Sequence, residues 1–397
     1  MSPVNYNKGM MKFEFVLCLE WIYTASMANV RAQHTAAVLS NGKVLIVGGF
    51  SMSGFLFPTE LYDPSTQAWT PTGSIHYGRR FHAISELLDG KVLVTGGYGE
   101  TNGSMFTNSV ELYDPISENW TFMQSMHQIR YGHTASTLLN GKVLVVGGVY
   151  DNRHSSNSAE LYDPSTGLWT MTGNITQKRA FHTASILFDG RVLIVGGIID
   201  QSYPTKTSEL YDPSTGLWTA IGNISEARIG HTAVTLKNGK VLIIGGIGES
   251  DFGTNRTELY DPSTGQWTLT GEMKYSRIFH TASLLHNGNV LVAGGDNRTN
   301  GDIAPINTTE IYNSSTGIWT NVQEMGTSRE GHTASVLHNG NVLVAGGVRS
   351  NGELIRTAEL FVSSAVAKFL PSRILEFCYS VLIIASFLDF VPSKILH

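Results

Sequence analysis

One pattern of roughly 50 residues recurs along most of this 397-residue chain. Each copy carries a histidine at the start of a short run that becomes apolar, and a pair of glycines after a second apolar run. The histidines are spaced 48, 51, 49, 49, 49 and 52 residues apart, and the paired glycines keep step with them. Repetition at this period with strand-like content indicates radial or linear stacking of one structural unit. The marker histidines are His34, His82, His133, His182, His231, His280 and His332.

Each repeat predicts four short strands, as residues 179–218 illustrate. A strand beginning at His182 leads into Asp189-Gly190, which predicts a two-residue hairpin with a type I′ turn, where both central residues have positive φ. The apolar run that follows predicts a second strand with both faces covered. Glu-Leu-Tyr predicts a third strand, Asp-Pro-Ser-Thr-Gly a tight turn, and Trp218 the start of a fourth. Because one such sheet cannot bury both of its faces, the repeats favour an all-β propeller.

The recurring sequences Arg-x-x-His-Thr-Ala, Asn-Gly-Lys-Val-Leu, Gly-Gly, Glu-Leu-Tyr-Asp-Pro and Trp resemble the Kelch family over about residues 21–362. This resemblance implies blades of four antiparallel strands. The WD-repeat alternative fits less well, because its period is shorter and no Trp-Asp pair ends these strands.

The two ends of the array predict how the ring closes. The seventh repeat stops at Glu359-Leu360-Phe361 without a following tryptophan, whereas Trp21 stands ten residues before Arg31, as Trp169 does before Arg179. We therefore expect a seven-bladed propeller over 13–362, closed by an N-terminal strand around Trp21 that joins the last blade and removes an open edge. We expect residues 1–12 to be disordered and 363–397 to form an atypical apolar tail, whose uncharged stretch is too short to span a membrane.

Charge and cysteine content limit the partners. A net charge of −5 and a pI near 6.2 give no basic field for nucleic acid. The two cysteines lie outside the repeats, so no disulfide framework or cysteine-based metal site is expected. The absence of a convincing signal peptide slightly favours the cytoplasm. Eight Asn-x-Ser/Thr sequences keep an extracellular location open, and we expect a monomer.

No catalytic or metal site is expected from the histidines, since a residue present in every repeat is first a structural part of that repeat. Within the Kelch family, galactose oxidase and its relatives are copper enzymes whose cofactor needs a cysteine in the propeller. Here no cysteine falls in a repeat, and fold alone does not confer function. We expect no cofactor.

An arginine stands three residues before each marker histidine. The family resemblance places these arginines in loops between blades near the central channel, where they would bind acidic side chains, and a guanidinium suits carboxylates. A glutamate begins the third strand of every repeat, so purely structural Arg–Glu pairing is the alternative. The candidate ligand-binding arginines are Arg31, Arg79, Arg130, Arg179, Arg228, Arg277 and Arg329.

The loops between the second and third strands differ from copy to copy, and loops on a rigid scaffold commonly carry recognition. In Kelch propellers they share a face with the arginine loops. Their aromatic and arginine side chains have the chemistry of interface hot spots, although ordinary solvent loops are the alternative. The candidates are Tyr98, Arg153, Tyr203, Phe252 and Arg298.

These observations predict a non-catalytic scaffold that binds a protein or peptide, with an acidic ligand favoured, through the face formed by both sets of loops. A carbohydrate-binding, small-molecule-binding or enzymatic propeller with a site in the central channel is the alternative. A purely architectural part of a larger assembly is a third reading.

Overall fold

The computed structural model describes residues 14–101, 104–200, 203–248, 252–298 and 303–368. Every regular element in these residues is a β-strand, and none of them forms a helix long and apolar enough to cross a membrane. The expected N-terminal disorder and most of the C-terminal tail lie outside the described residues. One compact unit comprises Leu19–Ser363.

The described residues form seven four-stranded antiparallel sheets. In hydrogen-bonded order, the first three contain β2 (Thr35–Val38), β3 (Val44–Val47), β6 (Thr59–Asp63) and β7 (Ala68–Thr72); β9 (Ala83–Glu86), β10 (Val92–Thr95), β13 (Val110–Asp114) and β14 (Asn119–Met123); and β15 (Thr134–Thr137), β16 (Val143–Val146), β17 (Ala159–Asp163) and β18 (Leu168–Met171).

The next three sheets repeat this order. They contain β19 (Thr183–Ile186), β20 (Val192–Val195), β23 (Ser208–Asp212) and β24 (Leu217–Ile221); β25 (Thr232–Thr235), β26 (Val241–Ile244), β27 (Thr257–Asp261) and β28 (Gln266–Leu269); and β29 (Thr281–Leu284), β30 (Val290–Ala293), β31 (Thr309–Asn313) and β32 (Ile318–Val322).

The seventh sheet draws strands from both ends of the chain, in the order β33 (Thr333–Val336), β34 (Val342–Ala345), β35 (Ala358–Lys368) and β1 (Glu14–Thr24). Six sheets pair the tyrosine of the third strand with the tryptophan of the fourth, as Tyr211 does with Trp218 at a ring-centroid distance of 5.0 Å. In the seventh sheet Phe361 and Trp21 make the corresponding contact at 5.2 Å. The N-terminal strand thus occupies the place of a fourth strand.

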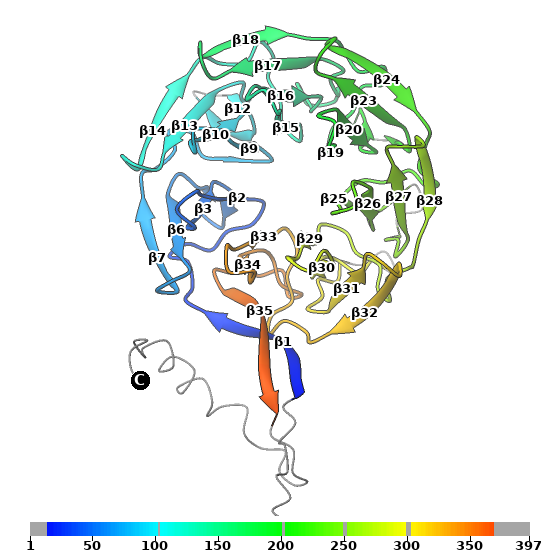
Figure 1. Cartoon of the computed structure of the whole chain (residues 1–397). Coiled ribbons are helices and arrows are strands. Elements are labelled where there is room, and N and C mark those ends of the chain that lie inside the picture. Colours follow the sequence, from blue (N-terminus) through cyan, green and yellow to red (C-terminus); the bar gives the residue numbers. More distant parts are fainter. Residues whose placement is uncertain (1–13, 102–103, 201–202, 249–251, 299–302, 369–397) are drawn as a thin grey trace, which may run out of the picture. The chain divides into compact units, whose positions relative to one another are not determined.

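Figure 1 shows the sheets arranged radially, with the first strand of each repeat innermost. The apolar second strands are entirely buried, as in Val192–Val195. Each main apolar cluster combines residues of two neighbouring sheets; one joins Leu193 to Ile243, and another joins Leu343 to Ile46. Packing between sheets, with alternating large and small side chains, therefore supplies the core.

The hairpin between the first two strands differs from the expected type I′ turn. In the hairpin of residues 138–142, the amide of Gly141 donates to the carbonyl of Leu138 at 2.9 Å, and only the glycine has positive φ, at 82°. This is a type I turn followed by a left-handed glycine, which makes a three-residue connection. Asn140 instead accepts a hydrogen bond from the Lys142 amide at 3.1 Å, so its preference arises from its side chain.

Short strands lie at the opposite end of the sheets, after the paired glycines or, for β8, just before the first strand of a repeat. They are β4 (Phe50–Ser51), β5 (Gly54–Phe55), β8 (Arg79–Arg80), β11 (Tyr98–Thr101), β12 (Ser104–Phe106), β21 (Ile198–Ile199) and β22 (Tyr203–Pro204). Because each second strand runs from a hairpin to a glycine pair, hairpins and decorated loops lie at opposite ends of the sheets. We call these the hairpin end and the loop end.

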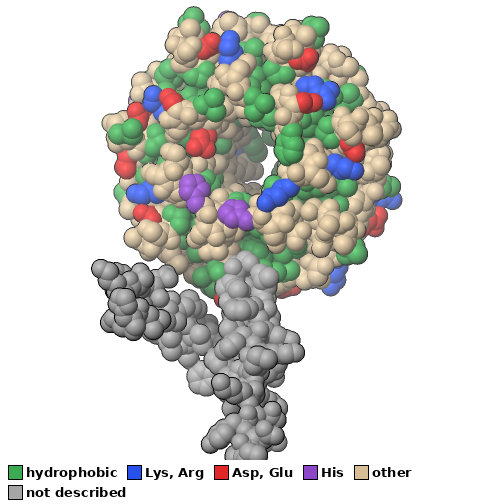
Figure 2. Space-filling view, viewed as in Figure 1, with side chains coloured by type: hydrophobic (Ala, Val, Ile, Leu, Met, Phe, Trp, Pro, Cys, Tyr) green, Lys and Arg blue, Asp and Glu red, His purple; other side chains and the backbone are tan. Residues whose placement is uncertain are grey.

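A central space is lined by small side chains of the innermost strands. A cavity of about 470 Å³ contacts β9, β15, β19 and β25, through residues such as Ser85, Ser136 and Ser185. Figure 2 shows the opening, with hydrophobic, basic and histidine side chains around its rim.

Candidate ligand-binding face

The seven repeat arginines are fully buried, with 0% of each side chain exposed. In each repeat the guanidinium donates to the carbonyl of the first glycine of the pair and to the glutamate of the third strand. For Arg179 these distances are 2.9 Å to the Gly196 carbonyl and 2.9 Å to Glu209 Oε1. Each arginine therefore joins a loop to its own sheet from inside.

The glutamates complete this link through the other carboxylate oxygen. Glu209 Oε2 accepts the backbone amide of Thr176 at 2.7 Å, in the loop that enters the repeat. The same pairing recurs in all seven repeats, at Arg–Glu distances of 2.6–3.0 Å. Burial of the Arg179 side chain lowers its pKa, and the charge of Glu209 opposes that shift.

The marker histidines are also internal. Six of them bond the threonine that follows the marker histidine of the adjacent sheet, as His182 Nε2 does with Thr134 Oγ1 at 3.0 Å. Ala83 occupies that position in the second repeat, so His133 bonds Thr95 Oγ1 at 2.8 Å instead. Within the described ranges, no three His, Cys, Asp or Glu side chains are grouped to hold a metal ion.

The candidate residues in the variable loops lie apart from one another. Tyr203 and Phe252 are exposed, at 70% and 50%, and Arg153 is also exposed. Arg298 pairs with buried Asp296 at 3.2 Å. Tyr98 is half-buried among aromatic rings rather than projecting into solvent. Of the five, Phe252 lines a pocket of the loop end.

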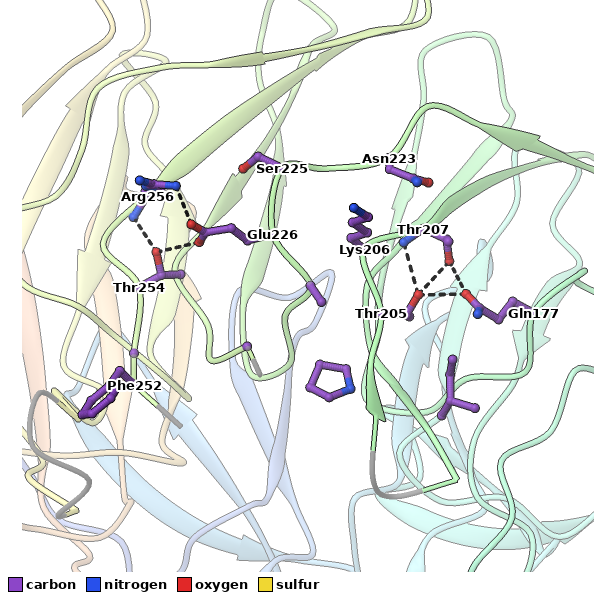
Figure 3. A pocket seen from close by; sticks show the side chains of 15 residues that line it. Gln177, Thr205, Lys206, Thr207, Asn223, Ser225, Glu226, Phe252, Thr254 and Arg256 are labelled. Atoms are coloured by element: carbon purple, nitrogen blue, oxygen red, sulfur yellow. Dashed lines mark hydrogen bonds and ion pairs between the residues drawn. The ribbon is translucent and has the colours of Figure 1, made fainter. Parts of the chain in front are cut away.

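That pocket, here called the Lys206–Arg256 pocket, lies between the fourth and fifth sheets and has a volume of about 740 Å³. Figure 3 shows its walls as two copies of one arrangement, a Gln or Glu side chain facing a threonine-rich segment. The lining residues are Gln177, Ile199, Pro204, Thr205, Lys206, Thr207, Asn223, Ser225, Glu226, Ala227, Gly248, Phe252, Gly253, Thr254 and Arg256.

One wall of the Lys206–Arg256 pocket is a neutral hydrogen-bond network. Gln177 Oε1 accepts from the hydroxyls of Thr205 and Thr207 at 2.8 and 2.5 Å. Buried Arg179 donates to the Thr207 hydroxyl at 2.9 Å, so the internal ion pair orients this wall. Fixed side chains lose little freedom when they bind a ligand.

The opposite wall is charged. Glu226 accepts from Thr254 Oγ1 at 3.3 Å and forms an ion pair with Arg256. Figure 3 shows Phe252 below Thr254 on this side. Lys206 is exposed and lies between Thr205 and Thr207, on the Gln177 side. The pocket offers amide and hydroxyl hydrogen bonds, two basic side chains and one aromatic surface.

A second pocket of about 590 Å³ adjoins the first, between the third and fourth sheets. Its lining includes Gln128, Tyr150 and Ser156, and it shares Gln177 and Ile199 with the Lys206–Arg256 pocket. Gln128 accepts from Ser156 Oγ at 2.7 Å, which repeats the arrangement of Gln177. The two pockets together form one polar surface across three sheets.

These pocket walls were absent from the sequence-based candidates. A signal was present, because a Gln or Glu stands two residues before Arg130, Arg179 and Arg228. Hydroxyl residues also alternate before the third strand in the second, third and fourth repeats, at Thr107/Ser109, Ser156/Ser158 and Thr205/Thr207. Their mutual contact depends on the pairing of two loops, which spacing alone does not reveal.

Comparison with known proteins is consistent with this geometry. The KLHDC2/KLHL20/DRC7 Kelch-repeats domain matches residues 82–271 and 182–365, and the Kelch motif matches residues 31–76. No curated protein matches the chain. A solved structure, a fungal alcohol oxidase of the AA5 family in complex with copper, is similar with a TM-score of 0.70 and 21% identity, over 89% of this chain and 76% of that one.

The structural likeness shows a shared fold alone. Kelch-repeat domains generally mediate protein–protein interactions and are mostly non-enzymatic. The repeat pattern, the four-stranded sheets and the family matches agree, and the chain belongs to the Kelch-repeat family of β-propellers.

Proposed function

We propose that this chain is a closed, seven-bladed, non-catalytic propeller that binds a protein or peptide at its loop end. Apolar clusters between neighbouring sheets support the closure, because they include a cluster between the seventh sheet and the first. The pairing of β1 beside β35 supports the assignment of the N-terminal strand to the last blade.

The observation that carries the binding proposal is the pair of adjoining pockets between the third, fourth and fifth sheets. They form a continuous surface with hydrogen-bonding walls, basic Lys206 and Arg256, and exposed Phe252. Arginine and aromatic side chains at the centre of an interface commonly supply most of its binding energy. Arg256 is shared between Glu226 and Glu272, and Lys206 adds a further positive charge, so the surface favours a polar or acidic segment.

The buried arginines hold this surface in place without forming it. The terminal nitrogens of each one donate to a glutamate and a carbonyl inside its own sheet, as in Arg179. We therefore propose that the seven arginines act structurally and that ligand contact belongs to the loop side chains.

The test is affinity capture from native lysate, with captured proteins identified by mass spectrometry and binding then measured with the purified partner. The pocket variant is Lys206→Ala, Phe252→Ala and Arg256→Ala. The matched control changes the same three residue types at the hairpin end, Lys142→Ala, Phe188→Ala and Arg191→Ala, where Phe188 is 70% exposed.

The proposal is supported if a partner binds the wild type and the control equally well but binds the pocket variant at least tenfold more weakly. Equal binding to the pocket variant, or loss from the control alone, contradicts this choice of face. Recovery of no specific partner by the wild type contradicts the scaffold function and favours the small-molecule alternative.

A further inference from the structure

Arg80 breaks the pattern of the repeats at a position that is otherwise apolar in most copies. The residue directly after the repeat arginine is Ala32, Tyr131, Ala180, Ile229 or Ile278 in five of the seven repeats. Ala32, Ala180 and Ile278 are fully buried there. A charged side chain is unfavourable at a position that is buried and apolar in most other repeats. Residues that break the local pattern in this way are concentrated at functional sites.

The Arg80 guanidinium lies among four aromatic rings. Its Cζ atom is 4.9 Å from the ring centroid of Phe50, 5.0 Å from Phe81, 5.2 Å from Tyr98 and 6.0 Å from Phe55. Cations are attracted to ring faces at these distances. We call these five residues the Arg80 cage.

The cation has no carboxylate partner in the described part of the chain. Nη1 donates to Gln33 Oε1 at 3.2 Å, and the buried Nε has no acceptor. The repeat arginines, by contrast, all pair with a glutamate. Burial lowers the pKa of Arg80, with the nearby Tyr98 and Tyr131 hydroxyls opposing the shift. A half-buried guanidinium without a carboxylate partner is poorly compensated until an acceptor binds.

A partly buried aromatic cluster continues from the cage across the neighbouring sheets, with Tyr131 buried and Phe81 and Phe181 partly exposed. Tyr98 contacts Phe106 at 5.4 Å, Phe106 stacks on Tyr131 at 5.5 Å, and Phe81 meets Phe181 edge to face at 5.3 Å. Phe81 and Phe181 both adopt left-handed backbone, with φ of 53° and 54°. This conformation is strained for a bulky residue, and the fold accepts it while placing both rings at the loop end.

We propose that the Arg80 cage binds a carboxylate attached to an aromatic ring, with the carboxylate on the guanidinium and the ring on the Phe81–Tyr131–Phe181 surface. The planar fork of arginine fits a carboxylate in two places, and the terminal nitrogens, of which Nη1 also bonds Gln33, supply its donors. Offset or edge contacts with the phenylalanine and tyrosine rings select an aromatic group over an aliphatic one. This site shares no lining residue with the Lys206–Arg256 pocket, so it is independent of the protein-binding proposal.

Such a ligand could be a free aromatic acid or an acidic residue beside an aromatic one in a peptide. The probes are therefore indole-3-acetate, its neutral analogue indole-3-acetamide, and the dipeptide Asp-Trp with acetylated and amidated ends. Binding to the full chain is measured by calorimetry and by saturation-transfer NMR. The variants are Arg80→Met, which keeps the aliphatic packing, and Arg80→Lys, which keeps the charge without the planar fork. Arg191→Met, at an arginine of the hairpin end, is the control.

We expect the wild type and Arg191→Met to bind indole-3-acetate at least tenfold more tightly than its amide. Arg80→Met should remove that preference, and Arg80→Lys should retain only part of it. Tighter binding of the dipeptide than of the free acid identifies a protein segment as the source, and the reverse identifies a small molecule. Either result supports the proposal that the Arg80 cage binds an aromatic carboxylate. No measurable binding of either acid to the wild type, or an unchanged preference for the acid in Arg80→Met, overturns the proposal.

Discussion

At the scale of single residues, the buried ion pairs set the strongest constraints. Removing one partner of a desolvated pair leaves the other charge uncompensated, which costs about 3–5 kcal/mol. We expect Arg179→Ala to lower the free energy of unfolding by about that amount, measured by chemical denaturation. The double variant Arg179→Met and Glu209→Leu should lose much less, since both charges are gone. Equal losses in both variants would contradict a purely structural ion pair.

Glu330 provides a second prediction at this scale. Burial, and then the negative charge of Asp296, raise the pKa of Glu330 to about 7, with Arg298 opposing. The folded state therefore binds this proton more tightly than the unfolded state. The contribution of Glu330 to the free energy of unfolding is present in acid and is lost as the pH rises through 7.

Glu330→Gln should accordingly stabilise the protein at pH 8 by about 1 kcal/mol, after allowance for the partial exposure of the group. The gain should vanish at pH 5. Thermal unfolding at the two pH values measures it, and Glu353→Gln, at an exposed glutamate, is the matched control. A gain that persists at pH 5 would indicate a cause other than the carboxyl charge.

Single-residue roles were only partly predictable from sequence. The recurrence of Arg179 with Glu209 left ligand contact and internal pairing both open, because periodicity shows that two residues matter together but not whether solvent reaches them. Arg80 was not among the ligand-binding residues predicted from the sequence, because it directly follows a repeat arginine. Its isolation from carboxylates depends on the aromatic rings that four separate short segments bring around it.

At the scale of elements, β1 is the strand with the clearest test. Trp21 is nearly buried, contacts Phe361 and donates its indole N–H to Thr309 Oγ1 at 3.3 Å. If this strand completes the last blade, its removal exposes an edge of the seventh sheet and part of the apolar cluster that contains Trp21. Deleting residues 1–24 should then sharply lower the melting temperature.

Deletion of residues 1–12 is the control for this experiment and should leave the melting temperature nearly unchanged. Trp21→Ala should give an intermediate loss of about 3–5 kcal/mol, typical of a buried tryptophan. An unaltered melting temperature after removal of 1–24 would rule out closure by β1.

The positions of the strands were more predictable from the sequence than the roles of single residues, although one turn type was predicted incorrectly. Apolar runs and Gly-Gly pairs correctly indicated the second strands, because continuous burial leaves an unmistakable composition. The prediction of a type I′ turn in the hairpin was wrong. Asn-Gly also suits a type I turn followed by a left-handed glycine, when the asparagine side chain accepts a hydrogen bond from the amide two residues later. The pocket walls were not predictable, because each wall forms only where two loops lie side by side. The packing of the sheets brings those loops together, and the sequence of either loop alone does not show it.

At the scale of the whole molecule, the seven marker histidines couple folding to pH. All are buried and neutral, because burial first and neighbouring arginine charge second hold their pKa values far below 6.5; those of His133, His231 and His280 fall to about 3. Unfolding releases these side chains to water, where they take up protons below pH 6.5. Stability contributed by each neutral histidine is therefore present at neutral pH and lost as the pH falls.

Each histidine should reduce the free energy of unfolding by about 1.4 kcal/mol per pH unit below pH 6.5. Because seven act together in one cooperative ring, we expect acid unfolding to begin between pH 6 and 5, above the range in which ordinary carboxylates titrate. Glu330 and Glu86, whose pKa values burial raises, bind protons in the folded state and offset part of this slope. Denaturant titrations from pH 7.5 to 5 give the net proton uptake directly. A variant with His231→Gln that still folds should take up one proton fewer, whereas a pH-independent free energy of unfolding across this range would mean that the histidines can be protonated inside the folded propeller.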